Sequence, residues 1–73
     1  KGEKIIRQQG FSQVRLRHHG ELARIEIDWK EFPLWLKPGI REKVVASLKK
    51  LGYRYITLDL EGYRTGSLNP SHR

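Results

Sequence analysis

The sequence predicts a small α+β domain whose elements follow the order α-β-β-α-β. Residues 13–27 alternate apolar and mostly charged side chains on both sides of a turn, which is typical of a β-hairpin. Residues 40–51 repeat apolar side chains at helical spacing, and residues 53–60 alternate again. We therefore expect a three-stranded sheet with two helices on one face, one layer packed on the other.

The first helix is expected over residues 3–9. Gly10 suits the left-handed position just past a helix end, and Phe11 is the apolar residue that often follows it. The hairpin comes next, with its turn at residues 18–21 around Gly20. On its return strand, one set of side chains should point toward the core and the other away from it: Ala23, Ile25 and Ile27 against Leu22, Arg24 and Glu26.

Residues 28–39 are predicted to be an irregular loop with at most one short turn, because Pro33 and Pro38 interrupt them. This segment is rich in aromatic side chains. We expect them to cover an open end of the core, since a domain this short lacks apolar bulk; they are Trp29, Phe32 and Trp35.

The second helix is predicted from Ile40 to Leu51, between Pro38 at its entry and Gly52 at its exit. The third strand should follow over residues 53–60, with Ile56, Leu58 and Leu60 inward and Tyr55, Thr57 and Asp59 outward. A helix joins the second and third strands, so a right-handed crossover should make them parallel. This plan is a truncated ferredoxin-like fold without its first strand. Either the third strand closes up beside the second, or an unpaired edge remains for another segment or chain.

Composition limits the classes of partner. The chain of 73 residues is one domain at most, and it carries 15 Lys and Arg against 8 Asp and Glu, a net charge of +7. Such a balance favours anionic partners. The lack of cysteine excludes disulfides, cysteine-ligated zinc and thiolate catalysis within these residues. The sequence has no methionine, even at position 1, so we expect it to be one domain of a longer protein. Without an apolar run or a secretory leader, we expect a cytoplasmic protein with no membrane partner.

The sheet face turned away from the helices is the main candidate for function. Alternation puts on it Arg15, Arg17, Arg24, Glu26, Tyr55, Thr57 and Asp59. One interpretation is a solvated face with cross-strand ion pairs. The other is an anion-binding face, because the planar guanidinium fork suits bidentate contact with carboxylate or phosphate.

Two further features carry weaker signals. His18 and His19 are adjacent on a strand and should point to opposite sides, so we expect no metal site there. Residues 61–73 hold glycines on both sides of Arg64 and nearby hydroxyl groups. This segment either cradles an anion with its backbone or is a flexible tail at a frayed terminus. We find no nucleophile-base set and therefore expect no catalytic residue.

Two stretches carry a family resemblance. "FSQVRLRHHGELARIEI" (11–27) and "LGYRYITLDLEGYRTGSLN" (51–69) resemble the C-terminal region of the ATP-dependent sacrificial sulfur transferases. This is the family of lactate-racemase maturation protein E, within the PP-loop ATP pyrophosphatases. The two stretches cover about half of the chain, and residues 28–50 carry no such signature.

The resemblance implies a C-terminal domain of an enzyme that adenylates a carboxylate of a pyridinium mononucleotide with ATP and Mg²⁺. Sulfur transfer then yields a thiocarboxylate of the nickel-pincer cofactor. The PP-loop and the sacrificial cysteine lie upstream in the family, so this part alone should hold no cofactor and perform no reaction. Its partners would be the upstream PP-loop domain of the same chain, the anionic mononucleotide and, as in the family, further copies in a homo-oligomer.

By motif position, the resemblance also implies the site residues. Arg15, Arg17 and Glu26 would face the substrate or a subunit interface, followed by Arg24 and Arg64. Two other functions stay open from the sequence. The positive charge allows a basic ferredoxin-like nucleic-acid-binding module, although Tyr55 is the one aromatic residue expected on the arginine face. The edge strand allows an oligomerisation domain.

Overall fold

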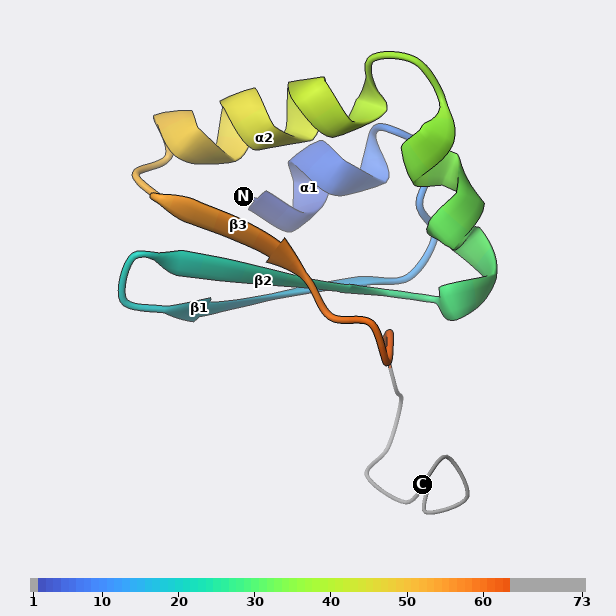
Figure 1. Cartoon of the computed structure of the whole chain (residues 1–73), viewed down its shortest axis with the longest axis horizontal. Helices are drawn as coiled ribbons and strands as arrows, with labels where there is room; N and C mark the ends of the chain where they lie inside the picture. Colours follow the sequence, from blue (N-terminus) through green and yellow to red (C-terminus); the bar gives the residue numbers. More distant parts are fainter. Residues whose placement is uncertain (1, 64–73) are drawn as a thin grey trace.

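One mixed sheet of three strands carries two α-helices on the same face (Figure 1). The structure is a computed structural model that describes residues 2–63. Its elements are α1 (Gly2–Arg7), β1 (Val14–His19), β2 (Leu22–Ile27), the 3₁₀ helix η1 (Trp29–Leu36), α2 (Ile40–Lys50) and β3 (Tyr55–Leu58). The predicted α+β class and the α-β-β-α-β order, a truncated ferredoxin-like plan, are confirmed.

The strand order in the sheet is β1-β2-β3, so the third strand closes up beside the second. β1 and β2 are antiparallel, with Leu16 opposite Ile25. β2 and β3 are parallel, with Ala23 opposite Ile56, as predicted for two strands that are joined through a helix. The hairpin turn needs a left-handed residue, which Gly20 supplies with φ 59°.

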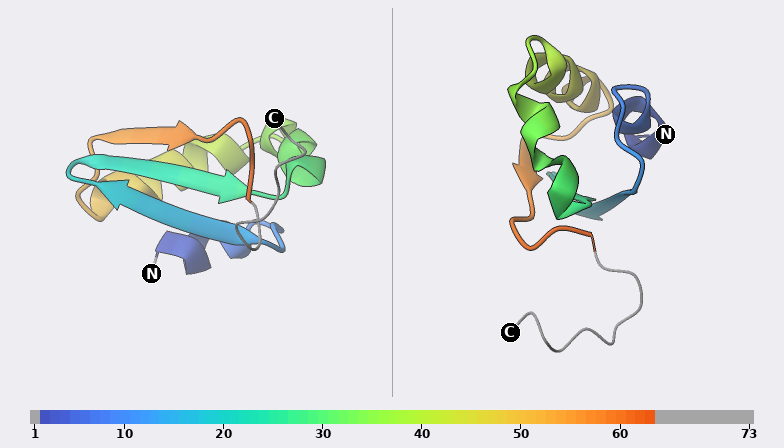
Figure 2. Two further views of the ribbon diagram at one scale, coloured as in Figure 1. Left: turned by 90° about the horizontal axis from the view of Figure 1, so that it is seen from below. Right: turned by 90° about the vertical axis from the view of Figure 1, so that its right-hand side faces the viewer.

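The core lies between the sheet and the helices. Its buried side chains come from both helices, the hairpin and the chain before it: Ile6, Phe11, Val14, Ala23, Ile25, Ile27, Val44 and Leu48. These include the predicted inward set of β2, and they leave the opposite face of the sheet free of helices (Figure 2, left). Among residues 2–63, no helix has the length and apolar character needed to cross a membrane.

The prediction of an irregular loop after the hairpin is wrong, because η1 occupies most of that segment. The Asp28 carboxylate caps it by accepting a hydrogen bond from the Lys30 N–H at 3.0 Å. Pro33 lies inside η1 and removes one N–H donor from this helix of eight residues. The helix forms nevertheless, and its aromatic side chains pack. The Trp35 ring lies 4.6 Å from that of buried Phe11, whereas Trp29 is 65% exposed and does not cover the core as expected.

The third strand is shorter than predicted. β3 ends at Leu58, and the chain then turns, with Glu61 N–H donating to the Asp59 carboxylate at 2.9 Å. Leu60, expected to point inward, is therefore 80% exposed.

Candidate anion-binding face

The sheet face away from the helices, called the open face below, carries the arginine side chains that the alternation predicted. Arg15 and Arg17 project from β1 and Arg24 from β2, while their neighbours Val14, Ala23 and Ile25 are buried in the core. The hairpin register places Arg15 opposite Glu26 and Arg17 opposite Arg24. Strand pleating alone thus gathers these charged groups on one surface.

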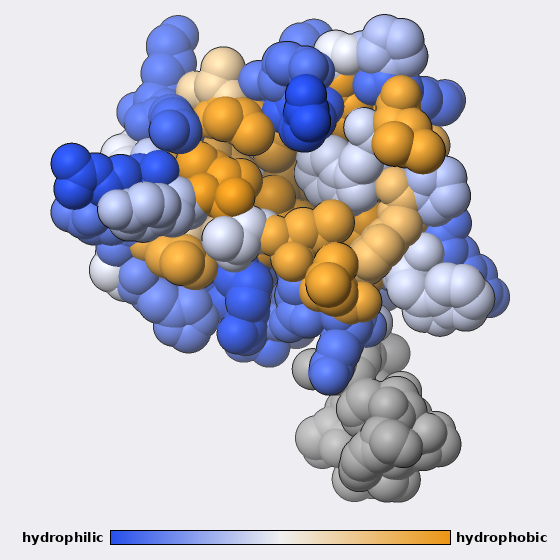
Figure 3. All heavy atoms as spheres, viewed as in Figure 1, coloured by the Kyte–Doolittle hydropathy of each residue, from blue (hydrophilic) through white to orange (hydrophobic). Residues whose placement is uncertain are grey.

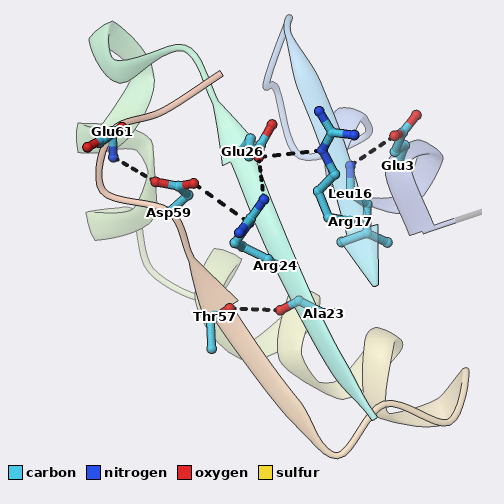
Figure 4. A network of polar contacts seen from close by, with 9 residues as sticks. All are labelled: Glu3, Leu16, Arg17, Ala23, Arg24, Glu26, Thr57, Asp59 and Glu61. Atoms are coloured by element: carbon cyan, nitrogen blue, oxygen red, sulfur yellow. Dashed lines mark hydrogen bonds and ion pairs between the residues drawn. The ribbon is translucent and has the colours of Figure 1, made fainter. Parts of the chain in front are cut away.

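Ion pairs link the charged groups across the sheet (Figure 4). Glu26 Oε2 lies 3.5 Å from Arg17 Nε on β1 and 3.2 Å from Arg24 Nη2 on its own strand. Arg24 Nε in turn lies 3.7 Å from Asp59 Oδ2, just past the end of β3. The cross-strand ion pairs expected of a solvated face are therefore present, and they restrict the positions of the Arg17 and Arg24 guanidinium groups.

Glu26 is buried although it lies on the open face. Its side chain is 7% exposed, against 47% for Arg17 and 40% for Arg24. A buried carboxylate is costly unless cations and hydrogen bonds compensate its charge, and the two guanidinium groups do so. Glu26 therefore orients Arg17 and Arg24 from beneath, and these two side chains stay partly exposed to solvent.

Residues 59–63, called the strap below, return across the open face at the end of β2 (Figure 2, left). Asp59 N–H donates to the Ile25 carbonyl at 2.8 Å, and Tyr63 N–H donates to the Ile27 carbonyl at 2.6 Å. The strap brings the Tyr63 ring to 5.5 Å from the Arg15 guanidinium, a cation–π contact. Sequence reasoning missed Tyr63, although the turn residues Asp59 and Gly62 mark the return of the chain.

The charges on the open face do not cancel. Three guanidinium groups, those of Arg15, Arg17 and Arg24, stand against two carboxylates, those of Glu26 and Asp59, and Arg15 has no ion pair within residues 2–63. Its guanidinium contacts an uncharged ring instead. The surplus positive charge therefore lies at Arg15, beside the exposed part of Arg17.

Two other sequence predictions concern this part of the molecule. Arg64 and most of the glycine-rich segment 61–73 lie outside the described residues, so the proposed backbone cradle stays a prediction. His18 contacts the edge of the Tyr53 ring, with centroids 6.2 Å apart. Within the described range, no group of three or more His, Cys, Asp or Glu side chains is arranged to hold a metal ion.

A groove lies on the helix side of the sheet, between α2 and β3. It has a volume of about 250 Å³ and is lined mainly by apolar side chains. Its lining includes Val44, Val45, Ile56 and Leu58, together with Arg41 and Trp35. Nothing in the pattern of the sequence predicted this groove, because it depends on how far apart α2 and β3 pack.

Comparison with known proteins finds similarity along nearly the whole chain. A pyridinium-3,5-bisthiocarboxylic acid mononucleotide synthase of Lactiplantibacillus plantarum is 42% identical over 67 residues, which are 92% of this chain and 24% of that protein. An uncharacterized protein of Synechocystis is 36% identical over 69 residues, 94% of this chain and 26% of that protein. No family model matches the chain. The chain thus spans about a quarter of the length of each of these relatives.

Proposed function

We propose that this chain is the substrate-positioning C-terminal domain of an ATP-dependent sulfur transferase that acts on a carboxylate of a pyridinium mononucleotide. The observation that carries the proposal is the 42% identity with a pyridinium-3,5-bisthiocarboxylic acid mononucleotide synthase over 92% of the chain. The arginine face supplies the matching chemistry, because such a nucleotide presents phosphate and carboxylate groups.

Arg15 and Arg17 are the proposed contacts to the anionic groups. They are two positions apart on β1, so their side chains leave the same face about 7 Å apart. Arg15 has no carboxylate partner among the described residues. Arg17 is about half exposed, and its ion pair with Glu26 is made through Nε, at 3.5 Å. Two adjacent guanidinium groups can each form charge-assisted hydrogen bonds to a phosphate or a carboxylate that enters from the open face.

Glu26 and Arg24 are proposed to position these contacts and to bind the substrate less directly. Glu26 holds Arg17 and Arg24 through one oxygen, and Asp59 holds Arg24 from the strap. Fixed guanidinium groups lose little freedom when an anion binds, which favours affinity. Arg64 follows the strap directly in the sequence and is proposed to add a further cation to the same site.

Adenylation and sulfur supply are assigned to an upstream PP-loop domain, which would bind ATP and Mg²⁺. The proposed contribution of this chain is orientation. A substrate held by its anionic groups presents one carboxylate to the adenylation site in a defined position. The same arginine face can also border a subunit interface in an oligomer. Neither role requires a nucleophile or a general base within these residues.

Titration of the chain with nicotinic acid mononucleotide, followed by NMR, tests the proposal. We expect shift changes at Arg15, Arg17 and Tyr63, and loss of binding by at least about tenfold in the R15A/R17A double variant, because each charge-assisted contact is worth about 1.5–3 kcal/mol. The double variant R41A/R54A removes the same charge from exposed sites off the open face and should bind normally. Equal affinity of the R15A/R17A variant and the wild type would contradict the assignment.

The longer protein provides the second readout. There, R15A/R17A should abolish sulfur transfer while the fold, judged by circular dichroism, is retained. Arg15→Lys should recover part of the binding, because lysine keeps the charge and loses the planar fork. Normal turnover in the double variant would show that the open face has no role in the reaction.

A further inference from the structure

Arg15 does not pair with the carboxylate that lies directly across the sheet from it. The hairpin register puts Glu26 opposite Arg15, where Cβ atoms are about 4.5–5.5 Å apart and opposite charges normally meet. The Glu26 carboxylate instead contacts Arg17 at 3.5 Å and Arg24 at 3.2 Å. The Arg15 guanidinium lies over the Tyr63 ring, 5.5 Å from its centroid. Within the described part of the chain, an aromatic ring thus takes the place of the expected carboxylate.

The backbone of the strap holds the Tyr63 ring in place. Tyr63 N–H donates to the Ile27 carbonyl at 2.6 Å, and Gly62 N–H donates to the Asp59 carbonyl at 3.0 Å. Gly62 is buried and Tyr63 is partly buried, so the strap packs on the end of β2. A ring anchored in this way restricts the rotamers of a long side chain such as Arg15 before any ligand binds, which lowers the entropic cost of binding.

A ring and a carboxylate have different effects on the charge of an arginine. The ring attracts the guanidinium through its quadrupole and is itself uncharged. A carboxylate would occupy the N–H donors and neutralise the charge. Figure 3 shows hydrophilic residues along the lower border of the molecule, on the side of the sheet away from the helices. An uncharged partner within this polar surface leaves the positive charge of Arg15 available to an incoming anion.

We propose that Tyr63 is a positioning residue for the anion site. Its ring holds the Arg15 guanidinium away from Glu26 and directs it, still charged, toward the anionic groups of the substrate. The inference rests on the proposed function and adds to it a residue that acts through Arg15. The ring is the required part of the side chain, and the hydroxyl group is not. Without the ring, Arg15 would turn to Glu26, and the surplus positive charge at this point would be lost.

This role has a reciprocal consequence for the strap. If the docked strap raises the affinity for an anion, anion binding stabilises the docked strap by the same factor. A ligand held by Arg15 should therefore slow hydrogen exchange of the Tyr63 N–H, which is bonded to the Ile27 carbonyl. A contact that only stabilises the fold would leave this exchange rate unchanged by the ligand.

NMR titration with nicotinic acid mononucleotide compares substitutions at Tyr63. Tyr63→Phe keeps the ring and should bind about as tightly as the wild type. Tyr63→Leu keeps apolar bulk and the backbone hydrogen bond but loses the ring. Its binding should be about two- to fivefold weaker, the range of an exposed cation–π contact. Tyr63→Glu places a carboxylate beside Arg15 and should weaken binding at least about tenfold, because the charge-assisted contact to the ligand is lost.

Tyr55→Leu is the matched control. It makes the same change at an exposed tyrosine of the open face, 55% exposed, but at the other end of the sheet. Tyr55 pairs with Leu22 in the register, whereas Arg15 lies opposite Glu26, four positions further along β2. This variant should therefore bind the nucleotide normally.

Two further NMR readouts report on the contact itself. A proton above a ring face is shifted upfield, so the Arg15 Hε signal should be shifted in the wild type and in Tyr63→Phe, and ordinary in Tyr63→Leu. Saturation with the nucleotide should slow exchange of the Tyr63 N–H in the wild type and leave it unchanged in Arg15→Ala. The exchange measurement on the wild type needs no variant, so it tests the inference even if a substitution prevents folding.

The outcomes separate this inference from the proposed function. Normal binding by Tyr63→Leu together with weaker binding by Arg15→Ala would overturn the role of Tyr63 and leave the proposed function intact. Unchanged exchange of the Tyr63 N–H in the wild type saturated with nucleotide would do the same. Normal binding by Arg15→Ala would overturn both. Native circular dichroism of each variant ensures that weaker binding reports on the site and not on unfolding.

Discussion

Among single residues, Glu26 has the most constrained environment on the open face. Its side chain is 7% exposed, and its carboxylate bridges Arg17 and Arg24. Removing one partner of such a cluster leaves the remaining charges without compensation, which costs more than the net value of the interaction. The geometry of the arginines therefore depends on this one carboxylate.

We predict that Glu26→Gln lowers the free energy of unfolding by about 1–3 kcal/mol, because the amide fits the space without neutralising the two guanidinium groups. Urea denaturation at neutral pH measures this change. Glu21→Gln is the control, since the pair between Glu21 and Arg54 is exposed at both ends and should contribute about 0–1 kcal/mol. Equal effects of the two substitutions would mean that Glu26 is not compensating buried charge.

Among the elements, the strap depends on a glycine. Gly62 has φ 81°, and a Cβ there would lie 2.8 Å from the Ile27 carbonyl oxygen and 3.4 Å from Trp29 N. Backbone atoms cannot move aside as a flexible side chain can. The close approach of strap and β2, which brings Tyr63 to Arg15, thus requires the absence of a side chain.

Gly62→Ala should release the strap and destabilise the chain by more than the ~1 kcal/mol typical of a left-handed glycine alone. Gly20→Ala isolates that conformational cost, because Gly20 also has positive φ but nothing within 4 Å of its Cβ. Urea midpoints compare the two variants, and hydrogen exchange of Tyr63 N–H follows the strap directly. Unchanged protection of Tyr63 N–H in Gly62→Ala would contradict this account.

The start of α2 gives a prediction about pH. A hydrogen bond from its own backbone N–H in the first turn, and then the nearby Arg41 guanidinium, hold the pKa of Glu42 below its usual value. A carboxyl with a lowered folded-state pKa stabilises the fold above its unfolded pKa, and this contribution is lost as the pH falls through the folded pKa. NMR titration of the Glu42 carboxyl should show the lowered pKa, and Arg41→Ala should return it partway. An ordinary pKa in the wild type would refute the assignment.

The elements also show which features local sequence can reveal. The hairpin and α2 were predicted because each depends on alternation or helical spacing within a short segment. The parallel third strand was predicted because a helix joins it to the second strand. η1 was missed because Pro33 indicated a break, while packing of Trp35 on Phe11 favours an ordered turn. Tyr63 was missed because its place depends on a contact with β2, distant in sequence. The open face was predictable, but the burial of Glu26 beneath its arginines was not.

At the scale of the whole molecule, the net charge of +7 governs the non-selective binding of polyanions. A single-stranded nucleic acid binds any strongly basic surface at low salt through release of counterions, without sequence selectivity. Selective binding would need aromatic platforms for stacked bases. On the described open face, Tyr55 is 55% exposed, while Tyr63 is partly buried against Arg15.

We therefore predict that a short RNA binds weakly at low salt and is released as salt rises, with a slope of about −0.7 for each phosphate contacted. The double variants R15A/R17A and K49A/K50A should reduce RNA affinity to a similar extent, because each removes the same charge. Binding of nicotinic acid mononucleotide, in contrast, should be lost only in R15A/R17A, where the fork geometry is removed. Fluorescence anisotropy at several salt concentrations measures the RNA series. Sequence-selective RNA binding at physiological salt that Tyr55→Ala abolishes would reverse the assignment and make the open face a nucleic-acid surface.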